Sequence, residues 1–479
     1  MCERSDVFIE DFYLGIMTGD GDKHAGVWNS SKSVVRSGIE SGPLTLFNID
    51  QRGEGDILVI SPLSKFMATS LTQVNGTLAY GVMGSMTAVP NNYNHSLIVF
   101  YSSKGINEGV REWGQAMQKA FNRTDQFRRS DLSNNYLGYY TDNGAYYYYH
   151  TEDGKDYEQT MLDSIQNISL PFRYLQIDSW WYYKGIGDGV AQWTPMPNVF
   201  PDGLPALDQK LNNIPIVAHN RYWAFDTVYK KNYSFVLSEK DGKALPVGND
   251  SFWIDLFTQA REWNLIVYEQ DWLITNVEAF TPLRTDIHLG AQWLRSMGEA
   301  ADKLNINLQY CMSLPRHILT ALEIPRVTQT RTSTDYAFHI MGKADQWAMG
   351  ISSMFAEAIG LASFKDVFWS TSLQPGRSYG PDTKEVLPER EILIATLSTG
   401  PVGPGDAINY TNVERIMKCC RKDGLILKPD RPLTTINALI SDWALYDSDS
   451  QGELYSTRTT VYVHLIYDSR FFSKLFCDI

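Results

Sequence analysis

The sequence predicts an α/β fold centred on a (β/α)8 TIM barrel, with a β-sandwich-like module before the barrel and a short β module after it. Short apolar runs alternate with longer amphipathic segments between residues 131 and 425, an order typical of such barrels. The residues on either side contain short strand-like runs separated by Gly, Asn, Pro and Ser clusters. A doubly wound open sheet is the alternative, but no Gly-rich phosphate loop follows the first barrel strand.

The composition is that of a folded, acidic chain. The 479 residues are 43% hydrophobic and 20% charged, so a packed core is available and wholesale disorder is excluded. The net charge of −13 argues against nucleic acid or an anionic membrane as the main partner, and no apolar run is long enough for a membrane-spanning helix. Aromatic residues reach 13%, which fits either a Tyr-rich core or a site that stacks rings on sugars.

The N-terminal module is predicted to span residues 1–104, with strands at 43–49, 56–61 and 96–101 in a full or partial sandwich. A linking helix is expected within residues 105–130. One helical face would carry the apolar residues Ile106, Val110, Trp113, Met117 and Phe121. This stripe predicts a helix packed between the two larger parts of the chain.

The barrel is predicted to span residues 131–425. Its strand-like runs are 136–140, 174–177, 214–218, 265–268, 308–311, 326–330, 367–369 and 392–397. Amphipathic segments at 157–167, 252–263, 288–304 and 344–360 are expected to form helices between them. Residues 426–479 are too few for a full sandwich, so this C-terminal β module is expected to be small or truncated.

The cysteines and sequons bear on cofactors and compartment. Cys2, Cys311, Cys419, Cys420 and Cys477 do not form a disulfide framework, and no His/Cys cluster has zinc spacing, so no metal or organic cofactor is predicted. Sequons at Asn29, Asn75, Asn94, Asn122, Asn167, Asn232, Asn249 and Asn409 favour a secreted or lysosomal-type compartment. No signal peptide is visible, so a cytoplasmic location stays open, and the oligomeric state is not indicated.

Polar residues gather where the predicted barrel strands end, which is where the active sites of such barrels lie. Asp271 and Asp335 are the candidate catalytic residues, because two carboxylates from different strands can divide the roles needed for glycoside cleavage. An Asp just after a strand often caps the next helix instead. The candidate substrate-binding residues are Asp142, Asp178, Trp180, Trp181, His219, Glu269, Trp272, Arg331 and Trp369. Such a set suits a neutral polyhydroxylated substrate, an oligosaccharide or a glycoside.

Period-two alternation places Glu269 and Asp271 on the same side of the fourth strand. If that side faces the barrel axis, Asp271 lies at the mouth and Glu269 lies one layer below. Some candidates also have ordinary structural explanations. Trp side chains more often pack than stack on ligands, and His219 is expected to be a hydrogen-bonded structural histidine rather than a base. Cys311 is expected to be a buried strand residue.

Taken in order, these strand ends resemble clan D of the glycoside hydrolases, most closely family 36 with its α-galactosidases and raffinose-synthase-like members, and family 27 more distantly. The segment from Arg331 to Tyr336 resembles the Arg-x-Ser-Asp-Asp-aromatic motif, in which the Asp four residues after the Arg is the general acid/base. The segment ending at Asp271 resembles the strand-four Lys-x-Asp motif, whose Asp is the nucleophile. The segment from Asp178 to Trp181 resembles the Asp-Asp-x-Trp signature that binds sugar hydroxyls.

Two positions depart from this pattern. The Lys of the strand-four motif is Glu269 here, and the second Asp of the strand-two signature is Ser179. Glu269 places a second carboxylate beside Asp271, so one of the two should have a raised pKa unless Arg331 or another cation compensates. The resemblance therefore implies that the catalytic carboxylates are kept while the sugar contacts differ.

The resemblance implies a retaining glycoside hydrolase or transglycosylase that acts on α-linked sugars such as α-galactosides. In it Asp271 would be the nucleophile and Asp335 the acid/base. A catalytically inactive barrel that binds glycans is one alternative, motivated by the two departures. An inverting hydrolase that uses Glu269 as its base is another.

Overall fold

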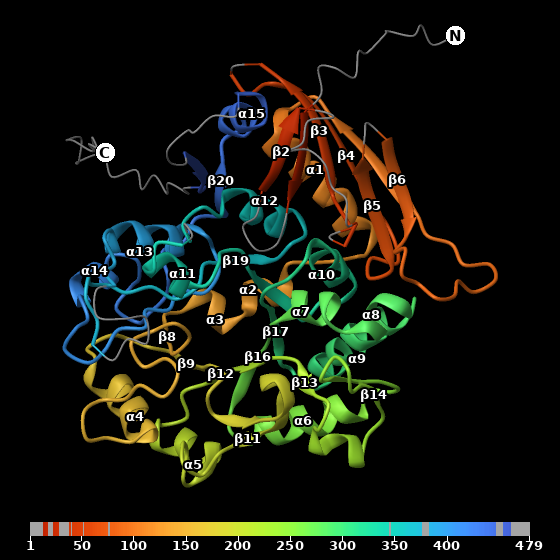
Figure 1. Cartoon of the computed structure of the whole chain (residues 1–479). Coiled ribbons are helices and arrows are strands. Elements are labelled where there is room, and N and C mark those ends of the chain that lie inside the picture. Colours follow the sequence, from red (N-terminus) through yellow and green to blue (C-terminus); the bar gives the residue numbers. More distant parts are fainter. Residues whose placement is uncertain are drawn as a thin grey trace, which may run out of the picture.

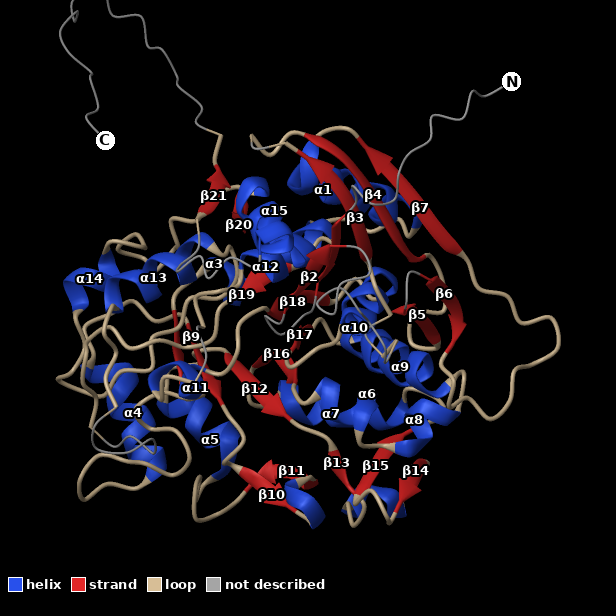
Figure 2. Cartoon of the chain, turned by 45° about the horizontal axis from the view of Figure 1, so that its top comes forward, coloured by secondary structure: helices blue, strands red, loops and turns tan. Residues whose placement is uncertain are grey.

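Figure 1 shows the computed structural model, which describes residues 13–17, 23–27, 38–39, 41–50, 52–74, 77–343, 346–375, 383–446 and 454–460. A central barrel lies between an N-terminal antiparallel sheet and a small second sheet at the opposite end of the molecule (Figures 1 and 2). The predicted barrel with a β-rich module before it is therefore confirmed.

The N-terminal sheet is antiparallel, with the strand order β2-β1-β3-β4-β7. Its strands are β1 (Tyr13–Met17), β2 (Lys23–Val27), β3 (Leu44–Ile49), β4 (Gly55–Pro62) and β7 (Leu97–Ser102), and a separate hairpin joins β5 (Thr69–Val74) to β6 (Thr77–Val82). Alternate residues serve opposite faces: Phe47 and Ile57 belong to the main core, whereas Leu44 and Ile60 pack with Leu71 of the hairpin. The hairpin covers part of one face, which makes a partial sandwich.

The linking helix α1 spans Gly105–Ala120 and lies between the N-terminal sheet and the barrel. Its predicted apolar face is confirmed, since Ile106, Val110, Trp113 and Met117 are all buried. The Trp113 indole donates to Ser61 Oγ of β4 at 3.2 Å and stacks against Phe355 of α12 (Gly350–Ala358). Two short helices, α2 (Gln126–Ser130) and α3 (Leu132–Asn135), lead from α1 into the barrel.

Seven parallel strands form the barrel sheet, in the order β19-β18-β17-β16-β12-β9-β8. They are β8 (Gly138–Tyr140), β9 (Tyr174–Ile177), β12 (Ile216–Asn220), β16 (Leu265–Gln270), β17 (Asn307–Tyr310), β18 (Val327–Arg331) and β19 (Ala362–Phe364). The longer helices are α4 (Tyr157–Asn167), α5 (Gly203–Lys210), α6 (Ser251–Arg261), α9 (Leu289–Lys303), α12 and α13 (Pro388–Leu397). Each of the four predicted helical segments overlaps one of them.

Several shorter helical segments complete this region. They are η2 (Ile186–Asp188), η3 (Val228–Lys231), α7 (Leu273–Glu278), α8 (Thr281–Thr285), α10 (Pro315–Thr320), η4 (Ala321–Glu323) and α11 (Tyr336–Ile340). Within the described ranges, no helix is long and apolar enough to cross a membrane.

The prediction was wrong for the last two barrel strands. The run 392–397 belongs to α13, which begins at Pro388 and has Glu389 and Glu391 in its first turn. A short apolar run does not distinguish a strand from a buried helix, whereas a Pro followed by acids is a helix-start signal. The seventh strand is β19, and the predicted run 367–369 follows it, with a bridge from Phe368 to Pro404.

The eighth position of the barrel is taken by residues 399–404, which pair through isolated parallel bridges instead of a continuous strand. Thr399 bridges Ser363 of β19, and Val402 bridges Leu137 just before β8. Gly403 lies against the Tyr140 ring, where an added Cβ would come within 1.8 Å of a ring carbon. Only glycine leaves room for this segment to close the barrel between β19 and β8.

The small second sheet, in the order β10-β11-β13-β15-β14, has no counterpart among the sequence predictions. Its strands are β10 (Tyr182–Lys184), β11 (Val190–Pro195), β13 (Trp223–Ala224), β14 (Phe235–Ser238) and β15 (Lys243–Pro246). They come from the two loops that follow β9 and β12, and they meet where Val190 pairs with Trp223. Because both loops leave the carboxyl ends of barrel strands, this sheet lies on the side of the barrel mouth.

The chain after the barrel comprises α14 (Val413–Met417), β20 (Arg431–Thr435), α15 (Asn437–Tyr446) and β21 (Tyr455–Arg458), with β20 and β21 antiparallel. The C-terminal module predicted at 426–479 thus contains a helix as well as a hairpin, and residues 461–479 lie outside the described residues. Helix α15 lies beside the N-terminal sheet (Figure 1), and Asn437 Nδ2 donates to Gly53 O at 2.8 Å. Segments from the two ends of the chain are therefore in contact.

Arg316 of α10 ties the barrel to the N-terminal module. Its side chain is fully buried and donates to the backbone carbonyls of Gly38, Ile39, Met67 and Thr69. A buried guanidinium requires such acceptors, and these carbonyls in turn lie in strand ends and turns that lack a complete ladder. The contact therefore orients one module relative to the other.

Replacing Arg316 with Met should destabilise the chain by about 3 kcal/mol or more, because buried carbonyls lose a charged donor. A urea titration followed by tryptophan fluorescence measures the effect. Arg295→Met is the matched control, since Arg295 forms an exposed ion pair with Glu323 and its loss should cost less than about 1 kcal/mol. Equal unfolding midpoints for the two variants would contradict the role given to Arg316.

Candidate active site

The interior of the barrel at its mouth is lined by side chains from β9, β12 and β16. Gln176 of β9 donates through Nε2 to Glu269 Oε2 of β16 at 3.1 Å, although β12 lies between these two strands in the sheet. Side chains of non-adjacent strands meet in this way only on the concave side of a closed sheet. The predicted orientation of Glu269 towards the barrel axis is therefore confirmed.

Asp271 lies directly beyond the end of β16 and is held as an ionised carboxylate. Oδ2 is 3.0 Å from His219 Nε2, and Oδ1 accepts the Trp272 amide at 2.6 Å. Trp272 has a φ of 59°, a left-handed conformation that is rare for a non-glycine residue. Burial alone would raise the pKa of Asp271, but the hydrogen bond and charge of His219, together with Arg331 and the Trp272 amide, lower it to about 2.

Glu269 lies deeper in the barrel, and its pKa is shifted in the direction opposite to that of Asp271. Only 2% of it is exposed. Burial, together with the negative charges of Asp178 and Asp271, raises its pKa to about 7, against the opposing effects of His219 and the hydrogen bond from Gln176. The expectation that one member of the Glu269–Asp271 pair has a raised pKa is confirmed, and that member is Glu269.

His219 joins the two carboxylate positions to the small second sheet. Nε2 is hydrogen-bonded to Asp271, and Nδ1 lies 3.0 Å from the hydroxyl of Tyr182 in β10. Burial alone would lower the pKa of His219, but Asp178, Asp271 and Glu269 raise it. Because both ring nitrogens are hydrogen-bonded, His219 is the structural histidine that the sequence predicts.

A second group of carboxylates lies around Arg331. Its guanidinium is 2.7 Å from Asp335 Oδ1, 3.9 Å from Asp142 Oδ2 and 4.0 Å from Asp366 Oδ2. The Asn143 amide donates to Asp142 at 2.8 Å and to Asp366 at 3.1 Å. Burial and the neighbouring Asp178, Asp366 and Asp335 raise the pKa of Asp142 well above its usual value, and Arg331 only partly offsets them. One buried cation therefore balances more than one acid.

Neither Asp271 nor Asp335 acts as a helix cap through its side chain. Asp335 directly precedes α11, yet its carboxylate makes no capping hydrogen bond and contacts Arg331 instead. Its side chain is 30% exposed, the most open of the acids that contact Arg331. The capping explanation is thereby excluded for Asp335, whose carboxylate is held by Arg331 instead.

The structure corrects the proposed contacts of three Trp side chains. Trp180, Trp181 and Trp369 are fully buried. The Trp180 ring is stacked on Tyr157 with centroids 3.6 Å apart, and Trp181 packs among Trp193, Trp263 and Tyr182. Because these three rings have no exposed surface, they offer no face to a sugar. Trp272 is partly exposed, with the Arg221 guanidinium 4.5 Å from its ring centre.

Three residues of this site are absent from the sequence candidates. Asp366 was missed because the seventh strand was placed after it, whereas the real strand β19 ends two residues before it. Tyr182 belongs to the small sheet, for which the sequence has no detectable signal. Gln176 shares the period-two face of Asp178 in β9, and that spacing could have identified it.

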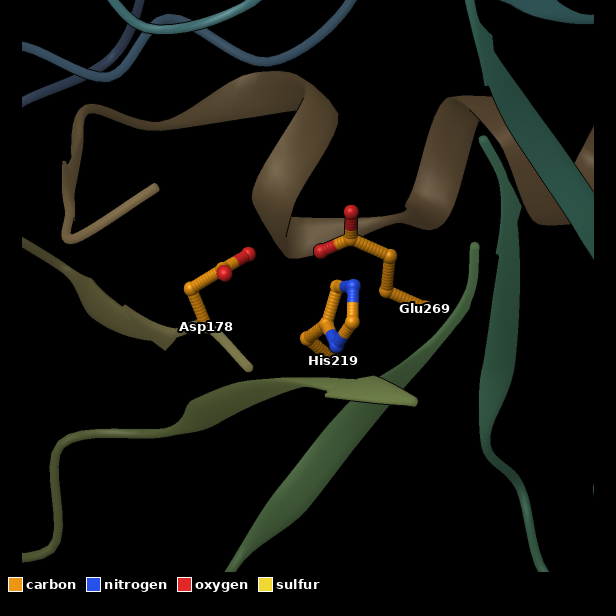
Figure 3. A group of neighbouring side chains, drawn as sticks. All are labelled: Asp178, His219 and Glu269. Carbon is orange, nitrogen blue, oxygen red and sulfur yellow. The ribbon is translucent and has the colours of Figure 1, made fainter. Parts of the chain in front are cut away.

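Among the residues that the structure describes, two groups of side chains have the composition of a metal site. In the first, ligand atoms of Asp178, His219 and Glu269 lie within 4.8 Å of one another and point toward one another (Figure 3). Both nitrogens of His219 are already hydrogen-bonded, which leaves no free lone pair for an ion.

The second group, His339, Glu385 and Glu391, is neutralised by protein groups. Lys365 Nζ lies 2.9 Å from Glu391 and Arg390 lies 3.1 Å from it, while the Tyr336 hydroxyl donates to Glu385 at 2.7 Å. The chemistry of both groups fits hydrogen-bonded networks better than a divalent ion.

No family model matches the chain, and no curated protein matches it. Solved structures do resemble it. The α-galactosidase from Thermus thermophilus in complex with stachyose has a TM-score of 0.50 at 14% identity, covering 79% of this chain and 78% of that one. The α-galactosidase from Lactobacillus brevis has a TM-score of 0.53 at 12% identity, covering 85% of this chain and 58% of that one.

A third similar structure is the galactosidase domain of an α-galactosidase–sucrose kinase, with a TM-score of 0.56 at 9% identity, covering 86% of this chain and 59% of that one. This chain therefore spans less than two thirds of the length of the second and third of these proteins. At this level of identity the similarity shows a shared fold, a (β/α)8 barrel with a β-rich module before it.

Glu269→Gln should change how stability depends on pH. The folded chain holds the pKa of Glu269 at about 7, against a usual value of 4.5, so between these values the folded state binds more protons than the unfolded state. Stability conferred by this group therefore falls as the pH rises through that window. The Gln side chain has no proton to lose. The free energy of unfolding of Glu269→Gln should therefore rise relative to that of the wild type as the pH increases from about 4.5 to about 7, and the difference between the two proteins should stay constant above about pH 7.

Melting temperatures of both proteins between about pH 4.5 and about pH 8 test this expectation. Glu278→Gln, which removes an exposed carboxylate at the end of α7, is the control and should show a difference that does not vary with pH. If the difference in melting temperature between Glu269→Gln and the wild type also did not vary with pH, Glu269 would ionise normally in the folded chain.

Proposed function

We propose that this protein is a retaining glycoside hydrolase, or a transglycosylase, that acts on α-linked sugars such as α-galactosides. The observation that carries the proposal is the pairing of one ionised carboxylate, Asp271, with a second and more open carboxylate, Asp335, both under the influence of Arg331. Two carboxylates with different environments can divide the two roles that glycoside cleavage needs. The names of the similar solved structures, which are α-galactosidases, support the class of sugar.

Asp271 is suited to the role of nucleophile. With a pKa of about 2 it is ionised at any physiological pH, and the hydrogen bonds from His219 and the Trp272 amide orient it. In the first step an Asp271 oxygen would bond to the anomeric carbon while the glycosidic C–O bond breaks, giving a glycosyl ester. Tyr182 would act through His219, by holding the imidazole that orients Asp271.

Asp335 is suited to the role of acid/base. In its protonated form it would give its proton to the departing glycosidic oxygen, and the resulting carboxylate would be stabilised by Arg331 at 2.7 Å. In the second step this carboxylate would take a proton from water, or from a sugar hydroxyl in a transfer reaction, and the incoming oxygen would displace Asp271. Retention requires the two carboxyl groups to lie about 5–5.5 Å apart during the reaction.

The remaining polar residues of the mouth would hold the sugar. Asp142, Asp178 and Glu269 present oxygens that can accept hydrogen bonds from hydroxyl groups, and Arg331 can donate. Trp272 keeps a partly exposed ring beside Asp271 and is the stacking surface that this proposal assigns to the substrate. None of these steps needs a metal or an organic cofactor.

Asp271→Asn should lower kcat/KM for an aryl α-galactoside by roughly 10³-fold or more, because the amide cannot form the glycosyl ester. Release of the phenol from a panel of aryl α- and β-glycosides measures this and identifies the sugar. Asp153→Asn, at an exposed carboxylate in the loop after β8, is the control and should leave the rate unchanged.

Two results would contradict the proposal. A folded wild-type protein that binds glycans but turns over none of the panel would favour an inactive glycan-binding barrel. A first-formed product of inverted anomeric configuration, measured by proton NMR, would favour an inverting enzyme with Glu269 as the base.

Asp335→Asn should discriminate between leaving groups. An activated phenol departs without a proton, so its release should fall at least about tenfold less than release from an unactivated disaccharide, which requires the acid. Rates with both substrates for the wild type and the variant supply the comparison. Equal losses for the two substrates would remove Asp335 from the acid/base role.

A further inference from the structure

Among the residues that the structure describes, Asp178 and Glu269 form a pair of buried acids with no ion pair to an Arg or Lys side chain. Asp178 follows the end of β9 and is 3% exposed, and Glu269 on β16 is 2% exposed. Figure 3 shows both carboxylates directed into the same space beside His219, and the three ligand atoms lie within 4.8 Å of one another. Two acids at this depth require a positive or donating group between them.

The cations near this space are engaged elsewhere. His219 donates to Asp271 and contacts Tyr182, so neither nitrogen is free to serve Asp178 or Glu269. Arg331 contacts Asp335, Asp142 and Asp366. Arg221 lies over the Trp272 ring and donates to Asp188 O at 3.1 Å. The direct contacts of these three cations are therefore with other groups, and His219 acts on Asp178 and Glu269 only through its charge.

Asp178 is the second and independent sign of a ligand. Within the part of the chain that the structure describes, its carboxylate accepts no hydrogen bond and forms no ion pair. Glu269 accepts one hydrogen bond, from the neutral amide of Gln176. A nearly buried carboxylate that is aimed into an active site and has no partner is completed by a donor on the substrate.

We propose, on the basis of the function proposed above, that the sugar bound at this mouth carries a protonated amino group, which lies between Asp178 and Glu269. The substrate class would thus be the α-linked hexosaminides with a free amine. A hydroxyl group would satisfy hydrogen bonds but would bring no positive charge to Asp178 and Glu269, whereas an ammonium group supplies three donors and a positive charge. A divalent ion is less suitable, because His219 has no free lone pair to bind it.

Ligand binding tests this inference separately from turnover. Isothermal titration of the whole wild-type protein at about pH 7, where an amine is still mostly protonated and Glu269 is partly ionised, compares D-galactosamine, D-galactose and N-acetyl-D-galactosamine at matched ionic strength. D-galactosamine should bind at least about tenfold more tightly than D-galactose, since one charge-assisted contact is worth about that factor. N-acetyl-D-galactosamine, which has no positive charge, should lack this advantage.

Two variants locate the effect. Glu269→Gln and Asp178→Asn should each bring the ratio of D-galactosamine affinity to D-galactose affinity to within about threefold of one, whatever change each variant makes in the affinity for D-galactose itself. Glu278→Gln removes the same charge from the exposed surface and should leave the preference intact. Circular dichroism checks that every variant is folded. If one of the two variants does not fold, the other still tests the inference.

Equal affinities of the wild type for D-galactosamine and D-galactose would overturn the inference. A preference for D-galactosamine that persists in both Glu269→Gln and Asp178→Asn would overturn it as well. So would a melting temperature that rises with MnCl₂ or ZnCl₂ alone in the wild type but not in Glu269→Gln, because the pair would then be a metal site. If aryl glycosides are not hydrolysed but the amine preference is present, the catalytic proposal fails and the binding inference stands.

Discussion

The balance of buried negative charge at the barrel mouth is the constraint on which the rest of the site depends. Asp142, Asp178, Glu269, Asp271 and Asp366 each have less than a tenth of their surface exposed. The cations that contact these acids directly are Arg331 and His219. Because an unpaired buried charge is unfavourable, the position of each cation decides which acid stays ionised. Asp271 stays ionised next to His219, whereas Glu269, farther from a cation, keeps its proton to near neutrality.

The architecture places these charges. Adjacent parallel strands β9, β12 and β16 bring Gln176, His219 and Glu269 to the inner side of the sheet, and the bridges of 399–404 close the barrel around them. The loops after β9 and β12 form a small sheet of their own, which delivers Tyr182 to His219. A loop held in a sheet positions a side chain more rigidly than a free loop, so the small sheet acts on the orientation of Asp271 through Tyr182 and His219.

The arrangement separates chemistry from recognition. The groups that tune the two candidate catalytic carboxylates, His219 for Asp271 and Arg331 for Asp335, form compact and satisfied contacts. Among the described residues, the pair Asp178 and Glu269 has no ion pair with Arg or Lys, its one side-chain hydrogen bond is the one from the Gln176 amide to Glu269, and it faces the same mouth. Under the proposed function, recognition of the sugar is therefore the part of the site in which this chain has most room to differ from the α-galactosidases of similar fold, since a change of charge there leaves the candidate catalytic carboxylates in place.

The sequence by itself determined the elements that follow from local periodicity. The linking helix α1, six of the barrel strands and the shared face of Glu269 and Asp271 follow from spacings of two, three and four residues, which neighbouring residues specify. The tertiary structure alone decided that residues 392–397 are helical, that Trp180 and Trp181 pack inside, that Asp366 joins Arg331, and that Glu269 is the acid with the raised pKa. The physical reason is that burial and charge pairing arise between residues far apart in the chain, so no local pattern contains them.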